Sequence, residues 1–96
     1  MWVRLALAKI KPESVDEFRK IWNDEVRPII EKQNGFVDAM FLEPVSEEDD
    51  FISCTLWESK ENGDAYEASG TYKELVGKVV HTLAAPPVVK SYEIQK

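Results

Sequence analysis

Cysteine and histidine are almost absent from this 96-residue sequence, which contains one of each, Cys54 and His81. A single cysteine excludes an intrachain disulfide, and a single histidine gives no ligand set for a structural zinc ion. Basic residues are also few, with 12 lysines and arginines against 18 aspartates and glutamates and a net charge of −6. Because nucleic acids and anionic membranes attract clustered positive charge, we expect neither as a partner.

Long apolar runs are missing as well. No stretch reaches the roughly 18 apolar residues of a membrane-spanning helix, and residues 1–8 lack the pattern of a secretory signal. The expected location is therefore the cytoplasm. With 44% hydrophobic and 31% charged residues, the chain has the composition of a globular protein. Its length predicts a single domain over residues 1–96.

Four short segments are rich in β-branched, aromatic and other apolar residues and are bounded by turn or charged residues. The predicted strands lie near residues 2–10, 36–43, 51–58 and 88–95. The first is apolar at almost every position, so we expect both of its faces to be covered. The acidic segment 43–50 lacks the alternating ligands and central glycine of a calcium loop, and is predicted to be a solvated hairpin loop.

Apolar residues recur at helical spacing in two further segments. The predicted helices lie near residues 14–33 and 60–84. Ser14 and Thr71 are each followed three positions later by a glutamate, which matches the capping box of a helix start. Pro28 is expected to kink the first helix or end its regular part early, and Gly70 to break the second.

The predicted order of elements is β-α-β-β-α-β, the split βαβ or ferredoxin-like arrangement of the α+β class. Right-handed crossovers place both helices on one face of a four-stranded antiparallel sheet. The other face is apolar too, and a bare apolar face of that size is not tolerated on a monomer. We therefore expect a homodimer through the helix-free face. The residues predicted on that face are Val3, Leu5, Leu7, Val37, Ala39 and Phe41.

Several short motifs occur along the chain in a characteristic order and spacing. They are Lys11-Pro12-Glu13-Ser14 at the first helix, Asn34-Gly35-Phe36 before the second strand, Trp57-Glu58-Ser59-Lys60 after the third, and the segment 87–94 at the close. This pattern resembles the antibiotic biosynthesis monooxygenase (ABM) family of the dimeric α/β-barrel superfamily. The resemblance implies homodimers whose sheets face each other, with a pocket between each sheet and its own helices. It also implies activities such as cofactor-independent oxygenation of phenolic or quinol-like polyketides, or haem degradation.

The haem-degrading members of that family carry an asparagine on strand 1, and a tryptophan and a histidine on helix 2. The corresponding positions here are near Ala6, Tyr66 and Val76, and none of the three matches. Quinol-type members often show a histidine where Tyr66 stands. We therefore expect no haem, no other cofactor and no structural metal.

Small residues at the middle of the strands, Ala6 among them, predict open space between sheet and helices. The candidates for catalysis in that pocket are Tyr66, His81 and Arg4. The candidates for substrate binding are Trp22, Trp57, Ala6, Tyr66 and Met40. Each has a plain structural alternative: His81 as a helix-surface residue, Arg4 as a partner of an acidic neighbour, and Tyr66 and the tryptophans as core.

The predicted function is that of a small cofactor-independent monooxygenase acting on an aromatic or polyketide-type apolar substrate. Two alternatives stay open at this point. One is a non-catalytic binder of an elongated, lipid-like apolar molecule, which needs only an apolar cavity with a polar mouth. The other is a dimerisation module without a ligand, which needs a filled core.

Overall fold

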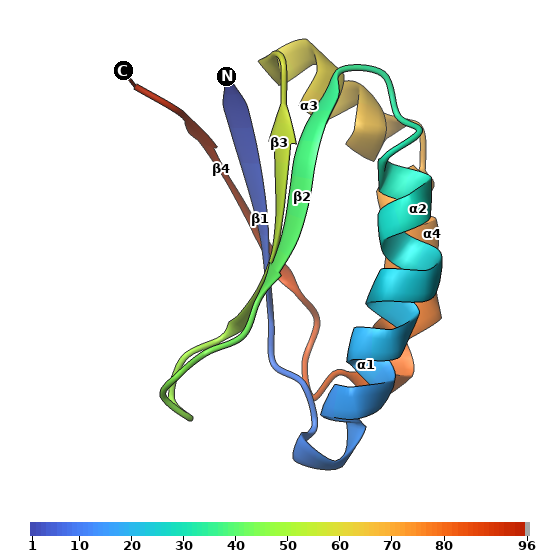
Figure 1. Ribbon diagram of the computed structural model, residues 1–96, viewed down its shortest axis with the longest axis vertical. Helices are drawn as coiled ribbons and strands as arrows, with labels where there is room; N and C mark the ends of the chain where they lie inside the picture. Colours follow the sequence, from blue (N-terminus) through green and yellow to red (C-terminus); the bar gives the residue numbers. More distant parts are fainter. Residues whose placement is uncertain (96) are drawn as a thin grey trace.

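Four strands form one antiparallel sheet in the computed structural model, which describes residues 1–95 (Figure 1). They are β1 (Trp2–Ala8), β2 (Phe36–Leu42), β3 (Phe51–Trp57) and β4 (Val88–Glu93). Their order in the sheet is β2-β3-β1-β4, and every neighbouring pair is antiparallel. All helices lie on one side of the sheet (Figure 1). The predicted ferredoxin-like fold of the α+β class is confirmed.

The first helical segment contains a wide turn next to its proline. It consists of a 3₁₀ turn (Pro12–Ser14), α1 (Val15–Ile21), a π-helical turn (Trp22–Val26) and α2 (Arg27–Ile30). Pro28 has no backbone N–H to donate to the carbonyl of Asp24 four residues earlier. The helix accommodates this missing hydrogen bond in the π turn, where the Arg27 N–H donates to the Trp22 carbonyl five residues back. The irregularity predicted at Pro28 is thus a widening that buries the side chains of Trp22 and Val26.

The second helical segment is divided, as predicted, at Gly70. Helix α3 (Lys60–Ala68) and helix α4 (Thr71–Val79) meet there, and a 3₁₀ turn (Val80–Thr82) follows. Gly70 has a φ of +85°, in the left-handed region that glycine adopts without strain. The predicted helix starts are only partly right. Ser14 is at the N-cap of α1, but its side chain makes no capping hydrogen bond, and Gly70 rather than Thr71 is the N-cap of α4. Helix α3 is capped by Ser59, which accepts a hydrogen bond from the Asn62 N–H.

The start of α3 is held against the loop that enters β2. Gly35 in that loop has a φ of +77°, and a Cβ atom there would lie 2.1 Å from Cγ of Asn62. Its carbonyl accepts a hydrogen bond of 2.9 Å from the Glu58 N–H, just after β3. This close approach sets the position of α3 over the sheet, and with it the position of Tyr66.

A β-bulge decides which side chains of β2 face the helices. Phe36 pairs with Trp57 but Asp38 pairs with Leu56, so Val37 is the extra residue. From Asp38 onward, the alternation is therefore shifted by one position. The sequence predicted Ala39 and Phe41 on the helix-free face, and this is wrong: the register puts them with Thr55 and Ser53, on the helix side.

The two faces of the sheet are both apolar but differ in side-chain size. The helix-facing positions include Ala6, Ala8, Ala39, Ser53, Thr55 and Trp57. The helix-free positions include Val3, Leu5, Leu7, Met40, Leu42, Ile52, Leu56, Val88 and Tyr92. Of the latter, Leu42, Val88 and Tyr92 are each more than 40% exposed in the single chain. No helix in the described part of the chain covers this second face (Figure 1).

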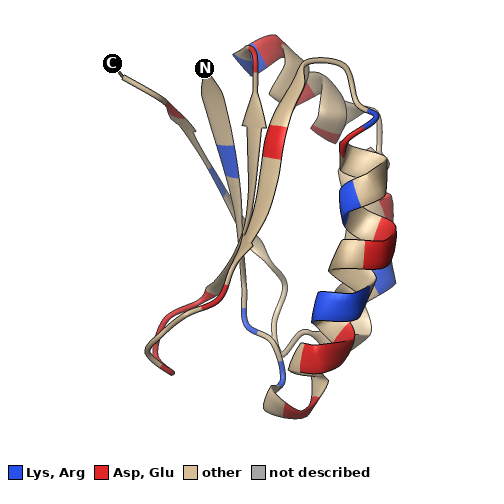
Figure 2. Ribbon diagram, viewed as in Figure 1, with Lys and Arg blue, Asp and Glu red and all other residues tan. Residues whose placement is uncertain are grey.

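Charged residues are concentrated in the helices and on the loop between β2 and β3, whereas the sheet carries few (Figure 2). None of the helices within residues 1–95 is long and apolar enough to cross a membrane. Over the same residues, no three or more His, Cys, Asp or Glu side chains gather where they could hold a metal ion.

Candidate functional site

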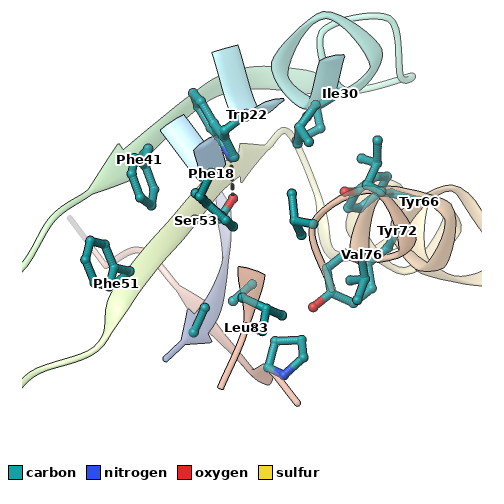
Figure 3. Close-up of a pocket in the computed structure, with 16 residues that line it drawn as sticks. Phe18, Trp22, Ile30, Phe41, Phe51, Ser53, Tyr66, Tyr72, Val76 and Leu83 are labelled. Atoms are coloured by element: carbon teal, nitrogen blue, oxygen red, sulfur yellow. Dashed lines mark hydrogen bonds between the residues drawn. The ribbon is translucent and has the colours of Figure 1, made fainter. Parts of the chain in front are cut away.

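A cavity of about 60 Å³ lies between the sheet and the helices (Figure 3). Its floor is made by strand residues with short or aromatic side chains: Ala6, Ala8, Phe41, Phe51 and Ser53. Its roof is made by helix residues that include Phe18, Trp22, Val26, Ile30, Tyr66, Tyr72, Leu75, Val76 and Val79. Nearly all of these side chains are apolar, so the cavity suits an apolar guest.

The cavity exists because the central strands carry short side chains. Ala6 and Ser53 are directly paired across β1 and β3 at the middle of the sheet, where larger residues would fill a solid core. Both are half-buried rather than buried, since the space above them is not filled. A volume of 60 Å³ is well below the roughly 150 Å³ that holds a benzene molecule. A ring-sized ligand therefore requires the half-buried lining side chains Tyr72, Val76 and Pro87 to move outward.

Aromatic rings form one wall of the cavity. Trp22, from the π turn, donates a hydrogen bond of 3.1 Å from its Nε1 to Ser53 Oγ. Its ring stacks with Phe41 at 5.9 Å between centroids, and Phe41 stacks in turn on Phe51 at 5.8 Å. Such a row of flat apolar surfaces is suited to the face of an aromatic ligand.

Arg4, Tyr66 and Tyr72 lie together at the opposite end of the cavity from Phe41 and Phe51 (Figure 3 shows the two tyrosines). Arg4 is only 5% exposed, and its Cζ lies 4.4 Å from the ring centroid of Tyr72 and 5.4 Å from that of Tyr66. Burial raises the pKa of both tyrosine hydroxyls, and the nearby Arg4 charge opposes part of that rise. At neutral pH both phenols are therefore protonated hydrogen-bond donors.

Glu67 supplies the counter-charge of Arg4. Its Oε2 atom is 3.3 Å from Arg4 Nη2, and its side chain is 57% exposed. The guanidinium thus has a carboxylate on its solvent side and the cavity on its inner side. The sequence had left open whether Arg4 pairs with an acidic neighbour or serves the pocket, and in the structure its position allows both.

Two of the predicted binding residues do not line the cavity. Trp57 is fully buried, donates a hydrogen bond of 2.9 Å to Thr55 Oγ1, and stacks at 4.9 Å against Tyr66. It packs against the ring of Tyr66, which does line the cavity. Met40 lies on the helix-free face, paired with Cys54, because the bulge at Val37 reverses the facing of β2. The prediction that Met40 reaches the pocket is therefore wrong.

His81 also lies outside the cavity. It belongs to the 3₁₀ turn after α4, its side chain is 53% exposed, and its Nε2 is 2.6 Å from Glu17 Oε2. This pair joins the ends of two helical segments at the surface. The location predicted for His81, at the polar part of the pocket, is wrong because the turn after α4 places the residue against Glu17, outside the cavity lining.

Tyr72 is the polar lining residue that the sequence analysis did not single out. It follows Tyr66 by six positions, a spacing that puts two residues on different faces of a continuous helix. The left-handed Gly70 between them redirects the chain, and the two rings meet edge to face at 6.1 Å. The available signal was the Gly70 break combined with the apolar stripe of α4 that begins at Tyr72.

Comparisons with solved structures find proteins of similar fold. A candidate antibiotic biosynthesis monooxygenase from Bordetella bronchiseptica is similar in structure, with a TM-score of 0.83 at 17% identity, covering 99% of this chain and 97% of that one. ActVA-Orf6, a monooxygenase of Streptomyces coelicolor solved in complex with Nanaomycin D, gives a TM-score of 0.81 at 16% identity and coverages of 99% and 88%. The heme-degrader MhuD of Mycobacterium tuberculosis, solved with two hemes in its active site, gives 0.80 at 20% identity and coverages of 98% and 95%.

At these identities the structural likeness establishes the fold. Among curated proteins, no significant match to the sequence is found. The sequence profile of the family described as antibiotic biosynthesis monooxygenase matches residues 1–78, most of the chain. This protein therefore belongs to the antibiotic biosynthesis monooxygenase (ABM) family.

Proposed function

We propose that this protein is a cofactor-independent monooxygenase whose cavity takes an aromatic, polyketide-type substrate. The observation that carries the proposal is the apolar cavity with an aromatic wall at one end and Arg4 with two tyrosines at the other. The similar fold of ActVA-Orf6, a monooxygenase solved with Nanaomycin D, supports it.

In such a reaction the substrate itself supplies the electrons. A phenol loses the hydrogen of its hydroxyl group and the hydrogen of one ring carbon, that carbon gains one oxygen atom of O₂ as a quinone carbonyl, and the second oxygen leaves as water. The protein's part is to hold the ring, favour its ionised form and keep the site dry. We assign ring binding to Trp22 and Ala6, and the polar role to Tyr66 and Arg4.

One observation favours a second candidate, a binder without turnover. Tyrosines 66 and 72 are the titratable side chains in the described lining of the cavity, and burial raises the pKa of each. Neither is a base at neutral pH, so proton removal from a substrate must rely on the charge of Arg4 or on solvent.

An oxygen electrode combined with tryptophan fluorescence separates the two candidates. Phenols and hydroquinones of one to three rings are added while quenching of Trp22 and O₂ consumption are followed together. Quenching with O₂ uptake supports the monooxygenase, and quenching without uptake supports the binder. If the whole panel changes neither signal and leaves the melting temperature unshifted, the remaining alternative is a dimerisation module.

Haem is a separate question, because the fold is similar to that of MhuD. Among the described residues that line the cavity, none is a histidine. We expect a haemin titration to give no sharp Soret band of one-to-one stoichiometry. Such a band would contradict the proposal that the protein works without a cofactor.

We also propose that the functional unit is a homodimer through the helix-free face of the sheet. That face presents large apolar side chains along all four strands, with Leu5 and Leu7 at its centre and Val88 and Tyr92 toward one edge. Burying such a face in an obligate dimer removes on the order of 2,000 Å² of surface from water. Sedimentation equilibrium at micromolar concentration should give twice the 11.0 kDa chain mass, and a monomer would overturn the proposal.

A further inference from the structure

We propose that the Arg4 end of the cavity is a subsite for one anionic oxygen, so that the substrate is a phenol or enol bound as its anion. The subsite consists of the Arg4 guanidinium and the Tyr72 hydroxyl. This proposal rests on the proposed function, because it requires that the cavity takes the ring of the ligand.

The first observation is that two of the three buried side-chain atoms found without a hydrogen bond in residues 1–95 belong to this end of the cavity, the third being Trp2 Nε1. Arg4 Nη2 and Tyr72 Oη are both inaccessible to solvent, and neither has a hydrogen-bond partner in the part of the chain that the structure describes. Arg4 Nη2 is within ion-pair distance of Glu67 but makes no hydrogen bond with it. Buried polar atoms are almost always hydrogen-bonded, so two neighbouring donors that make no hydrogen bond point to a missing acceptor, even though one of them has an ion-pair partner in Glu67.

The second observation is that space for this acceptor is present. A hollow of about 10 Å³ is lined by Arg4, Thr55 and four further residues, Ala6, Ser53, Tyr66 and Tyr72. Those four also line the main cavity, so the hollow adjoins it. Its volume is about that of one water-sized probe, which suits a single oxygen atom attached to a ring in the main cavity.

The third observation is the balance of charge around the guanidinium. Helix α3 contributes Tyr66 and Glu67 to its surroundings, and α4 contributes Tyr72. On the sheet its cross-strand neighbours are the uncharged Thr55 and Ser91. Glu67 is therefore the one negative group facing Arg4 from these elements, and it lies on the solvent side with 57% of its side chain exposed.

This arrangement favours the anion of a bound phenol over its neutral form. The positive charge of the guanidinium acts strongly on a nearby anion where water is scarce. The Tyr72 hydroxyl stays protonated because burial raises its pKa, so it remains a donor to an anionic oxygen. The proton lost by the phenol passes to solvent.

Two single-ring ligands of similar shape test the subsite. 4-Nitrophenol has a hydroxyl whose ionisation is visible in its absorbance, and 4-nitrotoluene carries a methyl group in the same place. We expect both to bind, with the pKa of bound 4-nitrophenol lower than that of the free compound. Binding of its anion should be about tenfold to a hundredfold tighter than binding of 4-nitrotoluene, as for one charge-assisted hydrogen bond.

Three variants are expected to change the pKa of bound 4-nitrophenol in different ways. Arg4→Met should abolish the lowering of the pKa of bound 4-nitrophenol. It should also weaken binding of the anion about tenfold to a hundredfold, with binding of 4-nitrotoluene unchanged. Tyr72→Phe keeps the ring against Arg4 and should remove part of the lowering of that pKa. Glu67→Gln removes the competing carboxylate and should lower the bound pKa further. If Arg4→Met does not fold, the opposite changes in the other two variants still decide the question.

The two ligands distinguish failure of the subsite proposal from failure of the cavity proposal. If 4-nitrotoluene binds but bound 4-nitrophenol has a pKa at or above that of the free compound, the anion subsite is overturned and the apolar cavity stands. If neither compound binds to the wild-type protein, both the cavity proposal and the subsite are overturned. A lowered pKa that is unchanged in all three variants places the anion elsewhere and also overturns the subsite.

Discussion

The two faces of the sheet are built from alternating residues of the same strands, yet they differ in a single property. Along β1, Ala6 and Ala8 face the helices while Leu5 and Leu7 face away from them. Along β3, Ser53 faces the helices and Ile52 faces away. Both faces are apolar, so polarity does not distinguish them. Side-chain size at the middle of the central strands does: short residues leave a cavity on one face, and long residues make a continuous surface on the other.

This comparison shows how one strand can serve two purposes. A strand places successive side chains on opposite faces, so a small–large alternation encodes a cavity and a flat apolar surface at once. A shift of one position would exchange the two, which is why the register of β2 and its bulge at Val37 matter. The predictions below alter one face at a time.

The largest effect is expected from a charge on the helix-free face. Leu5→Asp puts a carboxylate at the centre of the proposed dimer interface, next to Cys54 and Lys90 in the register. Desolvating a carboxylate in the interface costs on the order of 3 kcal/mol or more for each subunit, even with Lys90 as its cross-strand neighbour. Sedimentation equilibrium should show dissociation, and the protein should unfold at lower denaturant concentration.

The matched control is Val45→Asp, because Val45 is a fully exposed apolar residue in the loop between β2 and β3. It adds the same charge without touching either face, and its effect should stay within about 0.5 kcal/mol. If Leu5→Asp behaves like Val45→Asp, the helix-free face is not an interface.

The next effect concerns the small residue at the middle of the other face. Ala6→Phe inserts a ring into a cavity of 60 Å³, which should abolish quenching of Trp22 by aromatic ligands. Overpacking should lower the free energy of unfolding by about 1–3 kcal/mol while the dimer persists. The control Ala65→Phe makes the same change at an exposed position of α3. Unaltered ligand binding by Ala6→Phe would contradict the assignment of the cavity.

Alkaline pH tests the burial of the tyrosines on the helix side. Burial raises the pKa of Tyr66 in the folded protein above its ordinary value near 10, so the folded state keeps the proton longer than the unfolded state. Stability is therefore complete below pH 10 and falls as the pH rises from there toward the raised folded pKa. In Tyr66→Phe, denaturant titrations between pH 9 and 11.5 should show a shallower fall; an equal slope would argue against a buried hydroxyl.

The smallest effect is expected at the hydrogen bond of the aromatic wall. Ser53→Ala removes the acceptor of the Trp22 Nε1–H and should lower the free energy of unfolding by about 1 kcal/mol. Ser91→Ala, at an exposed helix-side position of β4, is the matched control and should be neutral. A shift of the tryptophan emission maximum in Ser53→Ala but not in Ser91→Ala would place the change at Trp22. Equal stability and emission of the two variants would contradict a stabilising role of this hydrogen bond.

Much of the fold was predictable because it depends on local pattern. The β-α-β-β-α-β order, the break at Gly70 and the irregularity near Pro28 each follow from the spacing of apolar residues or from the backbone of one residue. The open space above Ala6 was predictable from side-chain size. Of the predicted site residues, Ala6, Trp22 and Tyr66 line the cavity and Arg4 lines the adjoining hollow, because their strand or helix phase is visible in the sequence.

The rest was decided by contacts between distant segments. An extra residue at Val37 reverses the facing of β2, so Met40 and Phe41 lie on the opposite sides of the sheet from those predicted. The sequence of β2 alone did not indicate this, because a bulge depends on the pairing with the partner strand. His81 lies at the surface because the turn after α4 brings it to Glu17, 64 positions away in the sequence. Tyr72 meets Tyr66 and Arg4 only once α4 has turned at Gly70. The sequence by itself therefore determined the elements and their apolar phases, whereas the tertiary structure decided which polar side chains meet, since long-range packing and register set that geometry.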